Sequence, residues 1–219
     1  MAWPSALVMA LSPALAGCGA AEWHYVKNSG ARTYFKVPAG WREIDQRTLD
    51  RTLAPEDPDS AAAGVRARNI WSIAYDAHRD PDATHLYGLG SDEPFVYAVI
   101  RPLTEAERNA VSLDQLRDAF LPVTEKARQA SAQEGAALGA FELLRDRVLT
   151  PGGGLRGVRA TYNYRLPNLY SLQTFDVTSY SSDQGRLYVL VLRCSARCFR
   201  ERAKELDTIA RSFTVRNDR

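Results

Sequence analysis

Hydrophobic and polar residues alternate over several short segments of the chain, and residues that favour turns separate these segments. Alternation with a period of two is typical of strands that bury one face. Segments 70–75 and 95–100 are apolar on both faces instead, as strands covered on both sides are. The sequence predicts strands over 23–26, 32–37, 70–75, 95–100, 141–149, 157–166, 170–181 and 186–193.

The last four predicted strands are joined by short connections with turn residues, at 152–154, 167–168 and 183–185. Such short connections favour antiparallel hairpins over parallel crossovers. Gly152-x-Gly154-x-x-Gly157 has the letters of a dinucleotide-binding fingerprint, but the residues after it alternate as a strand does and do not open a helix. We therefore expect a hairpin loop there.

Helical patterns occur in four places, beginning at Asp45 and Ser112 and running over 123–134 and 196–212. Asp45 is a plausible N-cap, with Ile44 and Leu49 spaced as a hydrophobic staple, and Ser112-Leu113-Asp114-Gln115 fits a capping box. Residues 54–64 read as a loop. The prediction is an α+β fold in which helices pack on the faces of an antiparallel sheet.

The first eighteen residues have the features of a bacterial lipoprotein signal. Residues 5–17 are uncharged and mostly apolar, and Leu15-Ala16-Gly17-Cys18 resembles the lipobox, in which the cysteine receives a diacylglycerol. We expect a signal peptide at 1–17, a lipidated N-terminus and short tether at 18–22, and one domain at 23–219. The segment before the apolar stretch lacks Lys and Arg, so a plain cleaved signal peptide or a buried N-terminal helix remains an alternative. A lipidated Cys18 would hold the domain on the extracytoplasmic face of the cell membrane.

If Cys18 carries lipid, the remaining cysteines are Cys194 and Cys198. A secreted chain can oxidise such a pair, and in a helical segment the Cα atoms would lie about 6 Å apart, within disulfide reach. We expect a disulfide that clips a strand–helix junction. A redox-active dithiol is the alternative, although the spacing is not Cys-x-x-Cys.

Composition and charge exclude several classes of protein. The 28 basic residues nearly balance the 26 acidic ones, for a net charge of +2, which gives no electrostatic footprint for nucleic acid. The chain has no apolar run of the ~18 residues that span a bilayer. A hydrophobic fraction of 45% with 25% charged residues is that of an ordinary folded protein.

Two segments resemble a known family. Tyr34-Phe35-Lys36-Val37-Pro38-Ala39-Gly40-Trp41 resembles the strand and Pro-x-Gly-Trp opening of PsbP-like and Mog-type domains, including secreted bacterial lipoproteins of actinobacterial type. Strand 187–192, the amphipathic helix and Ile209–Val215 resemble the end of that domain, so the match spans roughly 23–216. The resemblance implies a sheet sandwiched by helices and a binding or accessory role. It carries over no catalytic residue, and neither the central region nor Cys194–Cys198 is part of the pattern.

No catalytic motif stands out in the sequence, so we expect no enzyme and no cofactor. One polar cluster could hold a divalent metal, because Asp and His alternate after a predicted strand: Asp76, His78, Asp80, Asp82 and His85. A solvated loop is the alternative. The aromatic residues of the late strands could line a ligand groove or pack as core: Tyr162, Tyr164, Tyr170, Phe175, Tyr180 and Tyr188.

These observations favour a non-catalytic, membrane-anchored envelope lipoprotein that acts as a binding or accessory module for a neighbouring protein complex. The alternative is a carrier or sensor of a small apolar ligand or lipid. An accessory module should expose an apolar or aromatic patch, whereas a carrier should enclose a cavity of a few hundred Å³.

Overall fold

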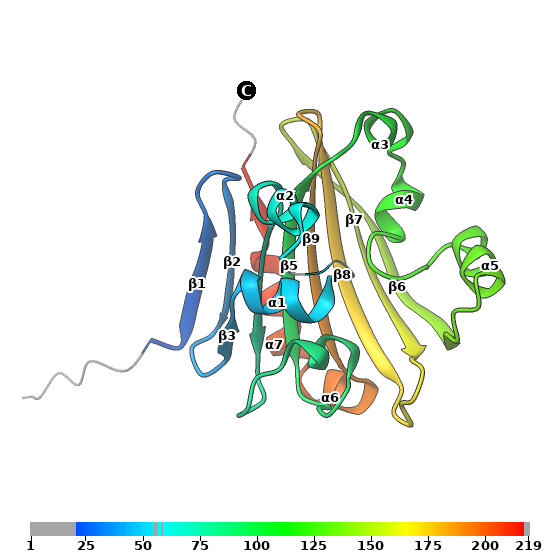
Figure 1. Ribbon diagram of the computed structural model, residues 1–219. Coiled ribbons are helices and arrows are strands. Elements are labelled where there is room, and N and C mark those ends of the chain that lie inside the picture. Colours follow the sequence, from blue (N-terminus) through cyan, green and yellow to red (C-terminus); the bar gives the residue numbers. More distant parts are fainter. Residues whose placement is uncertain (1–20, 55–56, 58, 217–219) are drawn as a thin grey trace, which may run out of the picture.

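The structure, a computed structural model of the chain, describes residues 21–54, 57 and 59–216. Its described strands form two antiparallel sheets (Figure 1). The large sheet has the order β3-β4-β5-β9-β8-β7-β6, with strands Arg42–Ile44, Trp71–Asp76, Phe95–Pro102, Arg186–Ser195, Gln173–Ser182, Leu155–Arg165 and Gly139–Gly152. The small sheet has the order β1-β2-β10, with strands Trp23–Asn28, Thr33–Pro38 and Thr214–Val215.

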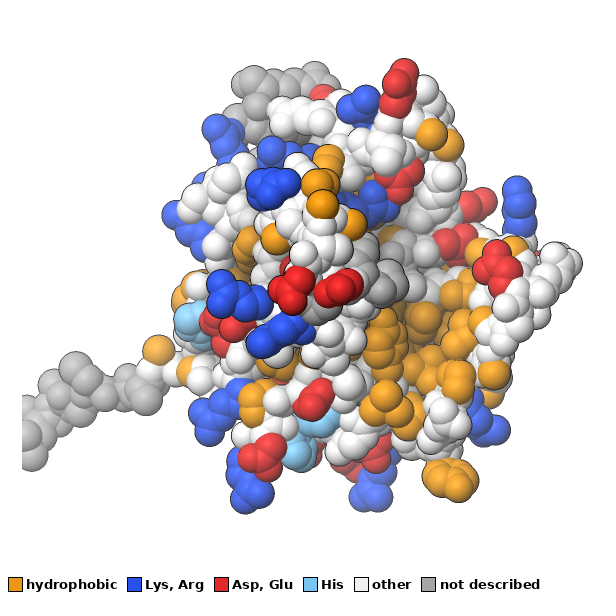
Figure 2. Space-filling view, viewed as in Figure 1, with side chains coloured by type: hydrophobic (Ala, Val, Ile, Leu, Met, Phe, Trp, Pro, Cys, Tyr) orange, Lys and Arg blue, Asp and Glu red, His pale blue; other side chains and the backbone are white. Residues whose placement is uncertain are grey.

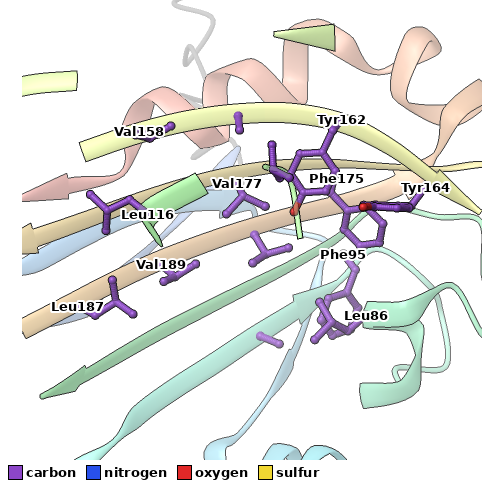
Figure 3. Packing of buried hydrophobic residues seen from close by; sticks show 14 of the residues in the cluster. Leu86, Phe95, Leu116, Val158, Tyr162, Tyr164, Phe175, Val177, Leu187 and Val189 are labelled. Carbon is purple, nitrogen blue, oxygen red and sulfur yellow. The ribbon is translucent and has the colours of Figure 1, made fainter. Parts of the chain in front are cut away.

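Alternation along β7, β8 and β9 sends side chains to two opposite faces of the large sheet. On the face that we call the front, Val158, Tyr162, Phe175, Val177 and Val189 join one hydrophobic core (Figure 3). Helices α1 (Gln46–Leu53), α4 (Leu113–Arg117) and α5 (Glu125–Gln133) lie on this side (Figure 1). Leu49 and Leu116 contribute their side chains to the core from α1 and α4.

The opposite face, which we call the rear, carries a second core. Leu190 and Leu192 of β9 pack there with Phe35 and Val37 of β2. Helix α7 (Ala203–Ser212) adds Leu206, Ile209 and Ala210 to the same cluster. Trp41 of the Pro-x-Gly-Trp segment is buried in this core.

The predicted helix starts are confirmed. The Asp45 side chain accepts a hydrogen bond from the Thr48 N–H, and the Ser112–Gln115 capping box is formed. Gly152, Gly153 and Gly154 have positive φ in the β6–β7 turn, where glycine meets no Cβ penalty, so the predicted hairpin loop is also confirmed.

The structure corrects four expectations about local structure. Residues 54–64 are not all loop, because Ser60 caps helix α2 (Ala61–Asn69). The helix after Ser112, whose apolar stripe predicts an end near Pro122, already ends at Arg117, because the Asp118 carboxylate accepts hydrogen bonds from the N–H groups of Val123 and Thr124 and turns the chain.

Residues 196–212 form two helices, α6 (Ala196–Glu201) and α7. They separate at Arg202, whose guanidinium pairs with Glu93 and Glu205 and lies over Trp41. The fourth correction concerns short elements that the sequence reading missed: β3, the 3₁₀ helix η1 (Ala83–Tyr87) and α3 (Glu105–Ala110).

None of the helices within the described residues combines the length and the apolar character needed to cross a membrane. Cys18, the signal peptide at 1–17 and the first part of the tether lie outside the described residues.

Candidate functional site

An apolar recess opens on the front face of the large sheet. Figure 2 shows hydrophobic side chains gathered in a hollow between the central helices and α5. Partly exposed hydrophobic residues packed against the front core include Phe120, Leu138, Phe141 and Leu169, and Tyr87 is 37% exposed. We call Tyr87, Phe120, Leu138, Phe141 and Leu169 the aromatic recess. It is a surface where apolar groups remain in contact with water.

The rings of the recess continue into the core as one contact series. Tyr87 stacks on Phe120 with ring centroids 6.2 Å apart, and Phe120 contacts Phe175 at 5.7 Å. Phe175 stacks on Tyr162 at 5.9 Å, and Tyr162 contacts Phe141 at 6.3 Å. Burial raises the pKa of the Tyr162 phenol, so this ring is neutral and acts as an apolar floor. The recess therefore has a continuous aromatic base.

The aromatic residues singled out in the sequence divide between the two faces. Tyr162, Tyr164 and Phe175 belong to the front core. Tyr180 and Tyr188 pack in the rear core. Tyr170 is fully exposed in the β7–β8 connection, one residue beyond Leu169 of the recess. The core interpretation is thus confirmed for most of them.

A second concave feature lies on the rear of the large sheet, between β6–β8 and helices α6–α7. It has a volume of about 400 Å³, and we call it the polar cleft. Alternation along β7 places Arg159, Thr161 and Asn163 on this side, and β8 brings Thr178, Asp176 and Thr174 opposite them. These side chains are nearly buried, so a polar layer lies under α7 where an apolar core would be expected.

An ion-pair network crosses the polar cleft. Nε and Nη2 of Arg159 donate to the Asp176 carboxylate at 2.9 and 2.6 Å, and Nη1 lies 3.0 Å from Asp207 of α7. Burial disfavours the charged guanidinium, but the hydrogen bonds and charges of Asp176 and Asp207 outweigh burial and raise the pKa of Arg159. The Arg159 guanidinium therefore stays charged although it is buried.

Two hydroxyl groups in this polar layer are left without a partner. Thr174 donates to Asn163 at 2.7 Å, but the Oγ1 atoms of Thr161 and Thr178 are buried without a hydrogen bond in the described structure. A buried hydroxyl without a partner costs about 1–3 kcal/mol. Thr161 also lines the cleft, so its hydroxyl could be satisfied by a group that enters it.

The sequence reading missed the residues of the polar cleft. The sequence does carry a signal for this polar cleft, because polar residues recur at every second position over 159–163 and over 174–178. A strand with a polar face normally turns that face to solvent, so only the position of α7 over these strands makes it a site.

The Asp/His cluster proposed as a metal site is used to hold a loop together. Asp76 is fully buried and accepts hydrogen bonds from the N–H groups of His78 and Asp82. Its Oδ2 lies 2.6 Å from Nδ1 of His85. Asp80 lies at the surface and pairs with the exposed Arg79.

Asp82 caps η1 by accepting from the Thr84 N–H. In the part of the chain that the structure describes, no three His, Cys, Asp or Glu side chains are placed to hold a metal ion.

Cys194 and Cys198 form a disulfide with Cα atoms 5.8 Å apart, in agreement with the predicted pairing and distance. Cys194 lies near the end of β9 and Cys198 in α6, so the bond clips a strand–helix junction.

Comparisons with known proteins place the fold. No family model and no curated protein sequence matches the chain. Among solved structures, cyanobacterial PsbP (CyanoP) from Synechocystis superposes with a TM-score of 0.55 at 12% identity, covering 93% of this chain and 98% of that one.

Two other solved structures are similar at lower scores. The Ran-binding protein Mog1p of Saccharomyces cerevisiae has a TM-score of 0.45 at 15% identity, covering 88% of this chain and 95% of that one. LpqN of Mycobacterium tuberculosis, described as involved in cell envelope biogenesis, has a TM-score of 0.43 at 17% identity, covering 84% and 82%. Because CyanoP matches almost end to end, the chain has the PsbP-like fold that the two sequence segments predicted.

Proposed function

We propose that the chain is a non-catalytic binding module, anchored to the extracytoplasmic face of the membrane through Cys18, that docks a neighbouring envelope protein in the aromatic recess. The observation that carries this proposal is the recess itself. Contiguous exposed apolar surface is uncommon on soluble monomers and marks interaction sites, and aromatic residues are enriched where binding energy concentrates.

The small volume of the cavity that adjoins the recess favours docking at the recess over enclosure of a small ligand there. The cavity beside the recess, against Phe141 and Tyr164, has a volume of about 140 Å³. Pockets that carry small ligands hold about 300–1,000 Å³. A carrier function is therefore the second candidate, with less support than docking.

The tether limits where the partner can be. Strand β1 begins at Trp23, so four residues separate it from Cys18. Fully extended, four residues reach about 13 Å. A lipidated chain of this length would keep the domain near the bilayer, and its partner would be a membrane protein or a protein held at the membrane surface.

The first test locates the partner on the surface of the full-length protein in its own membranes. A photo-crosslinking residue is placed at Tyr170, beside the recess, or at Tyr25, which is also exposed but lies on β1 at the opposite side of the molecule (Figure 1). We expect one envelope protein to crosslink from position 170 and not from position 25. Crosslinking from both positions alike, or from neither, would contradict docking in the recess.

The second test measures the affinity of that purified partner. Tyr87→Ser and Tyr170→Ser should each weaken binding about 30-fold, the effect of losing an aromatic anchor worth ~2 kcal/mol. Tyr25→Ser removes the same side chain from β1 and should leave the affinity unchanged. Loss of a co-extracted small apolar molecule from the Tyr87→Ser protein, with no effect on any protein partner, would favour the carrier function instead.

A further inference from the structure

The polar cleft on the rear face lies apart from the aromatic recess, since the large sheet separates them. Four basic and two acidic side chains line it, which leaves an excess of two positive charges. Arg159 and Arg211 are paired with the two carboxylates, Asp176 and Asp207. The excess charge therefore belongs to the other two cations, Arg145 and Lys204.

Arg145 and Lys204 are both exposed and have no ion-pair partner among the described residues. Arg145 lies on β6 directly opposite Thr161 in the strand register. Such cross-strand neighbours have Cβ atoms about 4.5–5.5 Å apart, so the guanidinium and the hydroxyl can reach one group. Lys204 lies on the stripe of α7 that also carries Asp207 and Arg211, one turn before Asp207, and faces the cleft from the other wall.

Thr161 supplies the independent sign that a ligand belongs here. Its side chain is nearly buried, it lines the cleft, and its hydroxyl has no partner in the protein. Native structures rarely leave such a group unsatisfied without a reason. Thr161 and the two unpaired cations line the same cleft, and such a set of hydrogen-bond donors suits an oxygen atom that carries negative charge.

The remaining walls set the shape of the ligand. Leu144 and Phe199 place apolar side chains on the strand and helix sides of the cleft. The volume of about 400 Å³ lies within the range of sites that bind small organic molecules. We propose that the polar cleft binds a small organic anion, with its carboxylate or phosphate oxygen atoms on Thr161, Arg145 and Lys204 and its apolar part against Leu144 and Phe199.

The proposal is tested by calorimetric titration of the purified full-length protein with three probes that share one apolar chain: hexanoate, hexyl phosphate and 1-hexanol. At least one of the anions should bind ten times more tightly than 1-hexanol, and the tighter anion identifies the head group. Equal binding of 1-hexanol and the anions, or no heat from either anion at millimolar concentration, would overturn the proposal.

Variants locate the site. Arg145→Ala and Lys204→Ala should each weaken binding of the anion about tenfold. Arg200→Ala is the matched control, because Arg200 is exposed on α6 and does not line the cleft. If all three variants weaken binding equally, the attraction is a general effect of charge and the site is refuted.

Thr161→Val separates a binding role from a structural one. Valine has nearly the same shape and removes the unpartnered hydroxyl, so the variant should unfold at a higher temperature than the natural protein. The same variant should bind the anion about tenfold more weakly. A variant that binds with unchanged affinity would show that the hydroxyl does not contact the ligand, against the proposal.

Discussion

Removing Asp176 should destabilise the protein strongly, because it leaves a buried cation short of its main partner. The Arg159 and Asp176 side chains are 8% and 2% exposed, and two hydrogen bonds join them. In Asp176→Leu the guanidinium keeps only the ion pair with Asp207, whose side chain is 31% exposed. Removing one partner of a buried ion pair costs about 3–5 kcal/mol. Because the ion pair with Asp207 remains, we expect a cost of ~3 kcal/mol for Asp176→Leu.

The measurement is urea unfolding followed by tryptophan fluorescence, with Trp41 buried in the rear core as a reporter. In a thermal melt of a chain of this size, a loss of ~3 kcal/mol in the free energy of unfolding lowers the Tm by about 6–12 °C. The double variant Arg159→Met/Asp176→Leu removes both charges and should recover to within about 1 kcal/mol of the natural protein, because a buried ion pair gains little over apolar side chains.

Asp80→Asn is the control, since Asp80 and its partner Arg79 are both largely exposed, and it should change the free energy of unfolding by no more than about 0.5 kcal/mol. A cost for Asp176→Leu as small as that of Asp80→Asn would show that water in the polar cleft solvates Arg159. The interpretation of this pair as buried would then be wrong.

Three further predictions concern acid stability, close packing and the disulfide. Hydrogen bonds from Arg101 lower the pKa of Glu107 to about 2, so the pair stabilises the fold above pH ~4.5 and loses its effect as pH falls towards 2. Both side chains are about one-third exposed, so Glu107→Gln should cost no more than about 1 kcal/mol at pH 7, and urea unfolding should show this difference vanish near pH 2. Gly157→Ala should cost about 1–3 kcal/mol in the same assay, because the new Cβ would overlap the Tyr180 ring; an unchanged midpoint would mean that the ring moves aside freely. Reducing the Cys194–Cys198 disulfide should lower the free energy of unfolding by less than ~3 kcal/mol, since the loop that it closes is short, and complete unfolding by dithiothreitol alone would contradict this.

The late strands show how much of the fold the local sequence pattern can predict. Their alternation and the turn residues between them predicted the β6–β7–β8–β9 meander, because both signals lie within a few residues of each other in the chain. The short elements β3 and η1 carry too few residues for any period, and they form only where the neighbouring strands and loops hold them. Helix α3 had a readable signal, the capping box of Thr104 and Glu107, which the sequence reading passed over.

The candidate sites could be predicted from local sequence pattern to a much smaller extent than the strands. The Asp/His cluster looked like a set of metal ligands because its residues are close in sequence. In the folded chain the Asp76 carboxylate binds backbone N–H groups and His85, and the described part of the chain places no three such side chains to hold a metal ion. Proximity along the chain does not fix where side chains point.

The sequence by itself determined the α+β class, the antiparallel meander and the pairing of Cys194 with Cys198. These features follow from periodicity, turn chemistry and short spacing, which act over a few residues. Only the tertiary structure decided which apolar residues stay uncovered at the aromatic recess, and that α7 lies over the polar side of β7 and β8. Both depend on how segments far apart in the chain pack against the same sheet, and burial of surface between distant segments leaves no periodic trace in the sequence.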